Sequence, residues 1–486
     1  MNREEKKEVR SQKSEVGRKS RWLVAVPCRF AVGNSRLLGM TARGTFAAAL
    51  AGALCFGWLA ATSLAQETGP AQETGSAAPR RITLREAVDL ALSNNRNIQI
   101  AQAGVDRAAA EHEEARSIFR PQVFFGSGLA ATKGFPLSIE GSAPAIFQVS
   151  TSQALFDPNL RNLERQAGQM AQAAGKSLVE TQDQIVAETV LTYLDLDRSR
   201  QSLKYLRSET ETLEAAEQIT ADRVEAGLEL PLEGTRAQLS TARSRSQLAA
   251  LENQISLLEF RLRDMTGIAQ SEPIVTQTAE VPSLAADETV EGLIARALGN
   301  YPGLRALDEE VLAKEFQVRS EQGSRWPRIN LVGQYGLFSK INNYDQYFQR
   351  FERNNATFGV SIVLPVYQRE GYNARLSKAQ AELAEARYRR EETRAIVSRQ
   401  VREMWGAIQQ QAAVRTVRRL ELELARKTLD AVLAQYEEGR VNRLIVEQSR
   451  VEENRAWVNL LNADFDAERA RLELWRLTGE IRAALQ

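Results

Sequence analysis

Long stretches without proline dominate this sequence. No proline lies between Pro158 and Pro231, and none follows Pro365. Both stretches are rich in Ala, Glu, Arg, Leu and Gln, which favour helices. As a single helix, residues 161–226 would be about 99 Å long at 1.5 Å per residue. Because a compact domain of this size does not need such long helices, the chain is predicted to be elongated.

The sequence also contains an internal repeat. Residues 80–267 and 290–479 carry the same features in the same order, and residues 268–289 connect them. The matching residues, at offsets of 206 (327 − 121) or 212 (439 − 227), are Asn94 and Asn300, Pro121 and Pro327, Gly227 and Gly439, and Gly267 and Gly479. Ordered matches at nearly constant offset indicate a duplication.

A heptad-like spacing follows each of the glycines at 227 and 439. Apolar residues there recur in steps of three and four, the spacing of a coiled-coil seam. The first set is Leu248, Leu251, Ile255, Leu258, Leu262 and Met265, and the second is Leu460, Ala463, Ala467, Ala470, Leu474 and Leu477. Each half is therefore predicted to form a long helical hairpin that turns near its glycine.

Two short segments with alternating apolar residues precede the hairpin in each half. They cover about residues 122–132 and 146–156 in the first half, and 328–338 and 356–366 in the second. The alternating residues are Val123, Phe125, Leu129 and Ala131; Phe147, Val149 and Leu155; Ile329, Leu331, Tyr335 and Leu337; and Phe358, Val360, Ile362 and Leu364. A period of two predicts strands with one apolar face, and each is long enough to cross a bilayer. Alternation alone fits soluble hairpins almost equally well.

Four strands cannot close a membrane barrel, because about eight is the smallest number observed. An open sheet edge cannot face lipid, since each unpaired backbone group would cost several kcal/mol. If these strands span a membrane, two, three or four copies of the chain must pool them.

The first 65 residues have the features of a secretory signal preceded by an extension. An apolar run from Phe46 to Leu64 follows the basic start at Met40, and small residues stand where cleavage after Ala65 needs them. Residues 1–39 then form an upstream extension, so that translation begins at Met1 or Met40. The alternative is an uncleaved transmembrane anchor. Both cysteines precede this cut, which excludes thiol chemistry from the mature chain.

Composition argues against several classes of function. The 63 basic and 62 acidic residues nearly cancel, which does not favour nucleic-acid binding. His112 is the single histidine and lies among glutamates, so a solvated helix face is a better interpretation than a metal site. No phosphate-binding or dinucleotide-binding motif occurs. The sequence therefore predicts no catalytic residues, no metal and no cofactor, and we expect that the chain is not an enzyme.

The duplicated layout, the Pro121 and Pro327 strand openings and the glycine-centred reversals resemble the TolC-like outer-membrane efflux protein family. The resemblance covers about residues 80–480. It implies an α+β membrane protein with four transmembrane strands per chain in a shared barrel and coiled-coil helices forming a periplasmic tunnel. It also implies a homotrimer in outer-membrane lipid, with a 12-stranded barrel, a periplasmic adaptor protein and an inner-membrane pump.

The function implied by this resemblance is a passive exit duct of a tripartite efflux or type I secretion system. The duct would carry small molecules or other cargo from the pump to the exterior. The alternative is a secreted or periplasmic coiled-coil scaffold protein with soluble hairpins. A scaffold would not need strands of membrane length in both halves.

The resemblance also points to site residues at the two reversals. The adaptor-contact positions are Ala226, Gly227 and Leu228 at the first and Glu438, Gly439 and Arg440 at the second. Candidates for a tunnel constriction are Glu233, Arg443, Glu447 and Gln448. Glu447 would form an acidic ring in an oligomer, or Arg440 and Arg443 would pair with nearby glutamates to hold the tips shut. The simpler interpretation of each is a solvated helix face.

Overall fold

The computed structural model describes residues 80–128, 145–277, 289–338, 352, 354–366 and 369–485. The expected signal segment and extension, residues 1–65, lie outside these described residues. So do residues 129–132, the end of the first expected strand.

Helices make up most of the described chain, and their lengths recur between the two halves. The first half contains α2 (Leu84–Asn94), α3 (Arg96–Ser117), α4 (Pro158–Glu225) and α5 (Pro231–Thr266). The second contains α6 (Val290–Asn300), α7 (Pro302–Gly323), α9 (Arg369–Glu437) and α10 (Arg443–Thr478), followed by α11 (Ile481–Leu485). Both α5 and α10 have 36 residues, and α4 and α9 have 68 and 69. At 1.5 Å per residue, α4 is about 100 Å long. None of these described helices combines the length and apolar character needed to span a bilayer.

Local sequence signals explain where these helices begin and end. Thr83 accepts a hydrogen bond from the Glu86 N–H at 3.2 Å and so caps α2. The Glu86 carboxylate binds Arg80 at 2.9 Å. Asp157 caps α4 through two backbone N–H groups, and Pro158 occupies the first turn, where its missing N–H is not needed. Within the described residues, four glycines have positive φ, each near +70°, and each lies just after the end of one of the four longest helices: Gly227, Gly267, Gly439 and Gly479.

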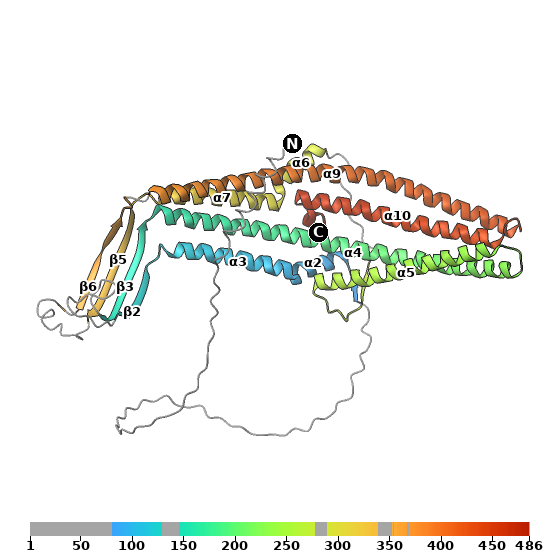
Figure 1. Cartoon of the computed structure of the whole chain (residues 1–486), viewed down its shortest axis with the longest axis horizontal. Coiled ribbons are helices and arrows are strands. Elements are labelled where there is room, and N and C mark those ends of the chain that lie inside the picture. Colours follow the sequence, from blue (N-terminus) through green and yellow to red (C-terminus); the bar gives the residue numbers. More distant parts are fainter. Residues whose placement is uncertain are drawn as a thin grey trace, which may run out of the picture. The chain divides into compact units, whose positions relative to one another are not determined.

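The long helices pack as antiparallel pairs, α4 with α5 and α9 with α10 (Figure 1). Of the first heptad set, Ile255, Leu258, Leu262 and Met265 are buried, while the two residues nearer the turn are half-buried. Hydroxyl groups continue the seam toward the turn, where Thr210 and Ser244 lie 2.8 Å apart. The α4–α5 pair is therefore held by apolar contacts in the body of the molecule and by polar contacts near its tip.

The middle of the molecule has a core that both halves share. Val88 of α2 and Val190 of α4 pack with Leu472 and Trp475 of α10. Ile481 of α11 joins the same cluster. The chain's C-terminal helices are therefore tied to its first half, and the two repeats form one packed unit.

One four-stranded antiparallel sheet lies beyond the helices, in the order β2-β3-β5-β6 (Figure 1). Its strands are β2 (Gln122–Gly128), β3 (Ala145–Phe156), β5 (Arg328–Phe338) and β6 (Asn354–Val363). The expected end of the last strand at residue 366 is wrong, because pairing with β5 stops at Val363 opposite Arg328. Pro365 follows closely, and proline lacks the N–H that a ladder needs.

The two faces of this sheet differ in polarity. Phe125, Val149 and Tyr335 are aligned across three strands, and Phe147 lies between the Phe125 and Tyr335 rings. The opposite face carries amides and hydroxyls in register, among them Ser150 opposite Gln334. The expectation that Leu155 lies on the same face of the sheet as Phe147 and Val149 is wrong. A bulge between Ala154 and Phe156 places Phe156, not Leu155, opposite Ile329 on the apolar face.

A second, two-stranded parallel sheet pairs β1 (Arg80–Ile82) with β4 (Ile274–Thr276) of the inter-repeat connection. The Tyr193 hydroxyl, fully buried on α4, lies 2.8 Å from the Ile82 carbonyl and 2.7 Å from the Gln277 carbonyl. It also accepts the Gln277 N–H at 2.8 Å. Tyr193 therefore fastens both strands to α4.

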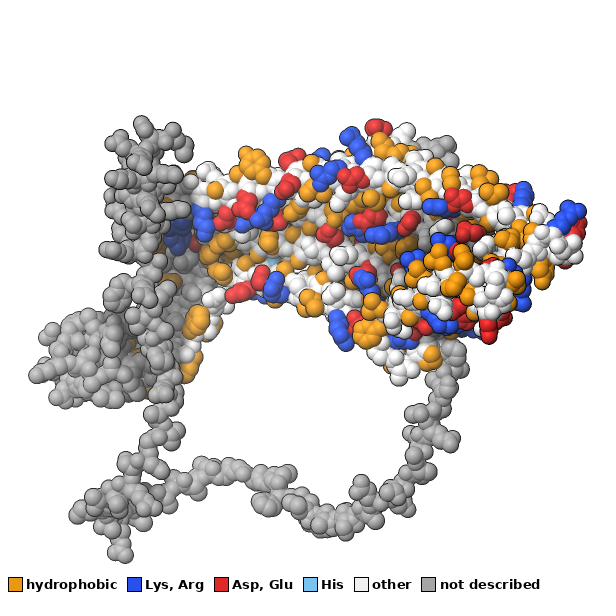
Figure 2. All heavy atoms as spheres, turned by 45° about the vertical axis from the view of Figure 1, so that its right-hand side comes forward, with side chains coloured by type: hydrophobic (Ala, Val, Ile, Leu, Met, Phe, Trp, Pro, Cys, Tyr) orange, Lys and Arg blue, Asp and Glu red, His pale blue; other side chains and the backbone are white. Residues whose placement is uncertain are grey.

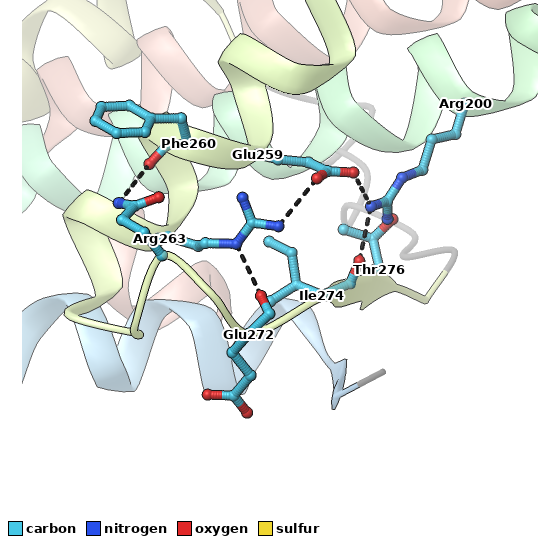
Figure 3. A network of polar contacts seen from close by, with 8 residues as sticks. Arg200, Glu259, Phe260, Arg263, Glu272, Ile274 and Thr276 are labelled. Carbon is cyan, nitrogen blue, oxygen red and sulfur yellow. Dashed lines mark hydrogen bonds and ion pairs between the residues drawn. The ribbon is translucent and has the colours of Figure 1, made fainter. Parts of the chain in front are cut away.

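Two arginines add polar contacts beside this small sheet (Figure 3). Arg200 donates to the Ile274 carbonyl at 2.7 Å, and its guanidinium lies 2.6 Å from the Glu259 carboxylate. Arg263 contacts the same carboxylate at 3.0 Å and the Glu272 carbonyl at 2.9 Å. One carboxylate of α5 thus orients two guanidinium groups that hold the connection against the helices.

Candidate functional site

The turn between α4 and α5 presents an apolar tip. Gly227 has φ of +69°, and the Leu228 N–H donates to the Arg223 carbonyl at 2.8 Å, which closes the end of α4. Ala226 is the last residue before this reversal. Leu228 and Leu230 are 68% and 67% exposed. The first reversal therefore offers exposed leucines on a turn that is closed by a backbone hydrogen bond.

The turn between α9 and α10 has the same backbone and different chemistry. Gly439 has φ of +73°, and the Arg440 N–H donates to the Gln435 carbonyl at 2.8 Å. The Arg440 guanidinium lies 2.9 Å from the Glu438 carboxylate, and both side chains are exposed. Asn442 then caps α10 through the Ile445 N–H at 3.1 Å. The second reversal is therefore charged where the first is apolar.

A cavity lies beside the two tips. Its volume is about 290 Å³, and α4, α5 and α10 line it. Glu233 of α5 and Glu447 and Gln448 of α10 are among the residues that line it. The structure thus brings together three of the four constriction candidates, and Arg443 reaches the group through Glu447 at 3.3 Å. Figure 2 shows this end of the molecule turned forward, with apolar and charged side chains close together.

For Glu447 the expectation of a solvated helix face is wrong. This residue is 4% exposed, and its carboxylate lies 3.3 Å from Arg443 and 3.5 Å from Arg450. The helix face that carries Glu447 packs toward α4, so burial follows from the contact between the two hairpins. Glu233 remains partly exposed and pairs with Arg236 at 2.5 Å. The described residues contain no group of three acidic, histidine or cysteine side chains placed to hold a metal ion.

One charged pair at the seam between α4 and α10 was not predicted from the sequence. Glu209 of α4 is 5% exposed, and Arg455 of α10 lies 3.1 Å from its carboxylate. Burial raises the pKa of Glu209, and the charge of Arg455 opposes that rise. These residues are 246 positions apart, so only the packing of one repeat against the other brings them together.

Long helical hairpins with a sheet at one end and a cavity beside their tips are features of an α+β channel subunit. A sequence model of the family described as outer membrane efflux protein matches residues 87–268 and, separately, residues 293–480. The chain therefore belongs to the outer membrane efflux protein family.

Individual relatives agree with this assignment. The outer membrane efflux protein BepC of Brucella suis is 23% identical over 414 residues, which are 84% of this chain and 88% of BepC. Outer membrane protein TolC of Vibrio cholerae is 23% identical over 308 residues, 62% of this chain and 68% of that protein.

Solved structures show the same fold. The outer membrane protein VceC of Vibrio cholerae matches with a TM-score of 0.68 at 17% identity, over 82% of this chain and 96% of VceC. A membrane protein from Pseudomonas aeruginosa matches with a TM-score of 0.68 at 21% identity, over 82% of this chain and 90% of that one. The protein is thus a passive outer-membrane efflux channel whose helices extend into the periplasm, and it is not an enzyme. The scaffold alternative is not supported.

Proposed function

We propose that three copies of this chain form the exit duct of a tripartite efflux or type I secretion system. A periplasmic adaptor would receive the helix tips, and an inner-membrane pump would supply the cargo and the energy. The observation that carries the proposal is the placement of the sheet and the tips at opposite ends of helices about 100 Å long. A chain built this way connects a membrane with a point deep in the periplasm.

The sheet supports a barrel shared between chains. Its edge strands β2 and β6 have no partner on their outer sides within the described residues. Lipid would leave these edges unsatisfied, and pairing β6 of one chain with β2 of the next removes them. The apolar face would then contact lipid, and the amide and hydroxyl face would line the exit.

The two tips support an adaptor contact in which their roles differ. Leu228 and Leu230 give the first tip apolar surface that a partner could bury. Glu438 and Arg440 give the second tip charged groups that already pair with each other. We therefore assign most of the adaptor's binding energy to the first tip, around Gly227.

The cavity beside the tips supports a constriction. Glu447, repeated once per chain, would place an acidic group and its two arginines around the closed end of the tunnel. Glu233 and Gln448 border the same cavity. Opening the tunnel would then require separation of α4 and α10, the helices between which Glu447 is buried.

Fractionation of cells that express the chain tests this proposal. We expect the protein in the outer membrane, migrating in unheated gels near three times the mass of the heated subunit. Recovery of a soluble monomer or dimer from the periplasm would overturn both the shared barrel and the duct.

A further inference from the structure

The duplication leaves part of the chain without the neighbours that its counterpart has. The long helix α4 packs on α2, α3 and α5 of its own repeat, and also on α7 and α10 of the other. Its counterpart α9 packs on α6, α7 and α10 of its own repeat. Within the described residues, α3 and α5 form no comparable packing against α9. In the second repeat, α7 and α10 each pack on both long helices, α4 and α9. In the first repeat, α3 and α5 pack on α4 but not comparably on α9, so α9 has no counterpart of those two neighbours in the described part of the chain.

The seam between α4 and α10 shows how the missing contact would be built. These helices run antiparallel, and Glu209 meets Arg455 at 3.1 Å. An offset of 212 residues (439 − 227) relates α4 to α9 near the tips, and the same offset relates α10 to α5 (443 − 231). At this offset, the counterpart of Glu209 is Glu421, and the counterpart of Arg455 is Arg243. The counterpart positions thus also carry one acidic and one basic residue, on two helices that do not pack along each other within the described chain.

Exposed apolar residues surround both counterparts. Thr212 and Val451, which line the cavity at the α4–α10 seam, are 9% and 5% exposed. Their counterparts Leu424 and Leu239 are 66% and 48% exposed.

The hydrogen-bonded pair next to Glu209 has apolar counterparts as well. The Asn454 amide donates to the Ser208 hydroxyl at 3.4 Å, and the counterparts of these residues are Ala242 and Leu420. Leu420 is itself 60% exposed. These leucines are exposed to water, whereas their counterparts in the other repeat lie in the packed seam between α4 and α10. Such an exposed apolar surface indicates a face that is covered in the assembled protein.

Two faces can be defined from these residues. The α9 face consists of Leu420, Glu421 and Leu424, and the α5 face consists of Leu239, Ala242 and Arg243. We infer that the α9 face of one chain binds the α5 face of a second copy, with the Glu421 carboxylate paired to the Arg243 guanidinium. The inference rests on the proposed assembly of identical chains and names the surface by which they meet.

Charge and symmetry both fit this occupant. Arg243 is exposed and has no ion pair or hydrogen bond within the described residues, while Glu421 contacts only Arg418 of its own helix at 2.8 Å. A carboxylate can accept a second donor, so both partners are free to form the contact. Because the two faces lie on different helices, the contact is head-to-tail, and such a contact generates a closed ring when the rotation from one chain to the next closes.

Cross-linking tests the register of the contact. Both cysteines of the chain precede the described residues, so Cys28→Ser with Cys55→Ser gives a thiol-free background. We expect a short bismaleimide to join chains of the variant Ala242→Cys/Leu420→Cys into dimers and trimers. A matched control, Ala242→Cys/Tyr388→Cys, should remain monomeric on the denaturing gel, because Tyr388 lies about 48 Å along α9 from residue 420.

The pair Ser208→Cys/Asn454→Cys calibrates the reagent, since it should cross-link within one chain without an increase in mass. A trimer captured by a general amine cross-linker, together with an unlinked Ala242→Cys/Leu420→Cys variant, would overturn the inferred register and leave the proposed assembly intact. Absence of any oligomer with the amine reagent would overturn the assembly and the inference with it.

Charge reversal tests the ion pair separately. We expect Arg243→Glu and Glu421→Arg each to lower the temperature at which the oligomer dissociates in gels, because each places like charges together. The double reversal should restore the dissociation temperature toward that of the unmodified chain. If the double variant is as weak as the sum of the two single variants, the two residues do not pair.

Discussion

Replacing Arg455 by methionine would show whether a buried charge pair holds the two hairpins together. Two guanidinium nitrogens of Arg455 lie 3.1 Å from one carboxylate oxygen of Glu209. The Glu209 side chain is 6% exposed, whereas that of Arg455 is 53% exposed. Methionine keeps much of the aliphatic stem and removes only the charge, so the change isolates the loss of the ion pair.

The expected cost follows from what the carboxylate does when its partner is gone. Breaking a buried pair by removing one partner costs about 3–5 kcal/mol. The Glu209 carboxyl can instead take up a proton. Protonating a carboxyl with an ordinary pKa of about 4.3 costs about 3.7 kcal/mol at pH 7, at 1.36 kcal/mol per pH unit. Water near the exposed stem of residue 455 lowers the cost further. We therefore expect the seam to lose about 2–4 kcal/mol at pH 7.

Hydrogen exchange measured in the assembled channel reports this loss. Where local opening governs exchange, the amides of residues 447–455 should exchange about 30- to 900-fold faster in Arg455→Met. Glu209→Gln in the same chain removes the unpaired charge and should recover most of the protection.

The pH dependence provides a second criterion. Burial raises the pKa of Glu209, so its contribution to stability is greatest below the ordinary glutamate pKa and is lost as pH rises through the raised value. Removing Arg455 raises that pKa further, and the defect of Arg455→Met should therefore shrink between pH 7 and pH 5. Exchange as slow as in the unmodified chain, or a defect equal at both pH values, would refute the reasoning.

Three further outcomes follow from other contacts. Tyr193→Phe keeps the buried ring but removes the hydroxyl shared by β1 and Gln277, which leaves backbone groups unsatisfied at a cost of about 1–3 kcal/mol. Amide hydrogen exchange at residues 80–82 should therefore become faster, while exchange at the tips is unchanged. Gly439→Ala should weaken the second tip by about 1–2 kcal/mol through backbone strain alone, since no atom lies within 4 Å of the added methyl group; an unchanged melting temperature would argue against this. Glu447→Ala leaves two arginines without their carboxylate, so the reversal potential in a salt gradient should shift toward anion selectivity, and an unchanged potential would place Glu447 outside the conducting path.

Packing between the two repeats explains why Glu447, at the cavity beside the tips, is buried although the sequence predicted a solvated helix face. Glu447 has the sequence surroundings of an exposed helix residue, with charged neighbours at three and four positions. Its burial depends on the face that α10 turns to α4, which local sequence does not encode. Leu155 shows the same limit in the sheet, because a single bulge shifts its register relative to the alternating pattern.

Periodicity, proline placement and glycine determined much of this protein from the sequence alone. A 3–4 apolar spacing can be satisfied only by helices packed along their length, and the positive φ of Gly227 and Gly439 marks where those helices reverse. The pairing of one repeat with the other was decided only by the tertiary structure. Glu209 and Arg455 meet because two long helices cross-pack at one register among several that the heptads allow. A one-dimensional pattern specifies which face is buried, whereas its partner and register depend on side chains hundreds of residues away.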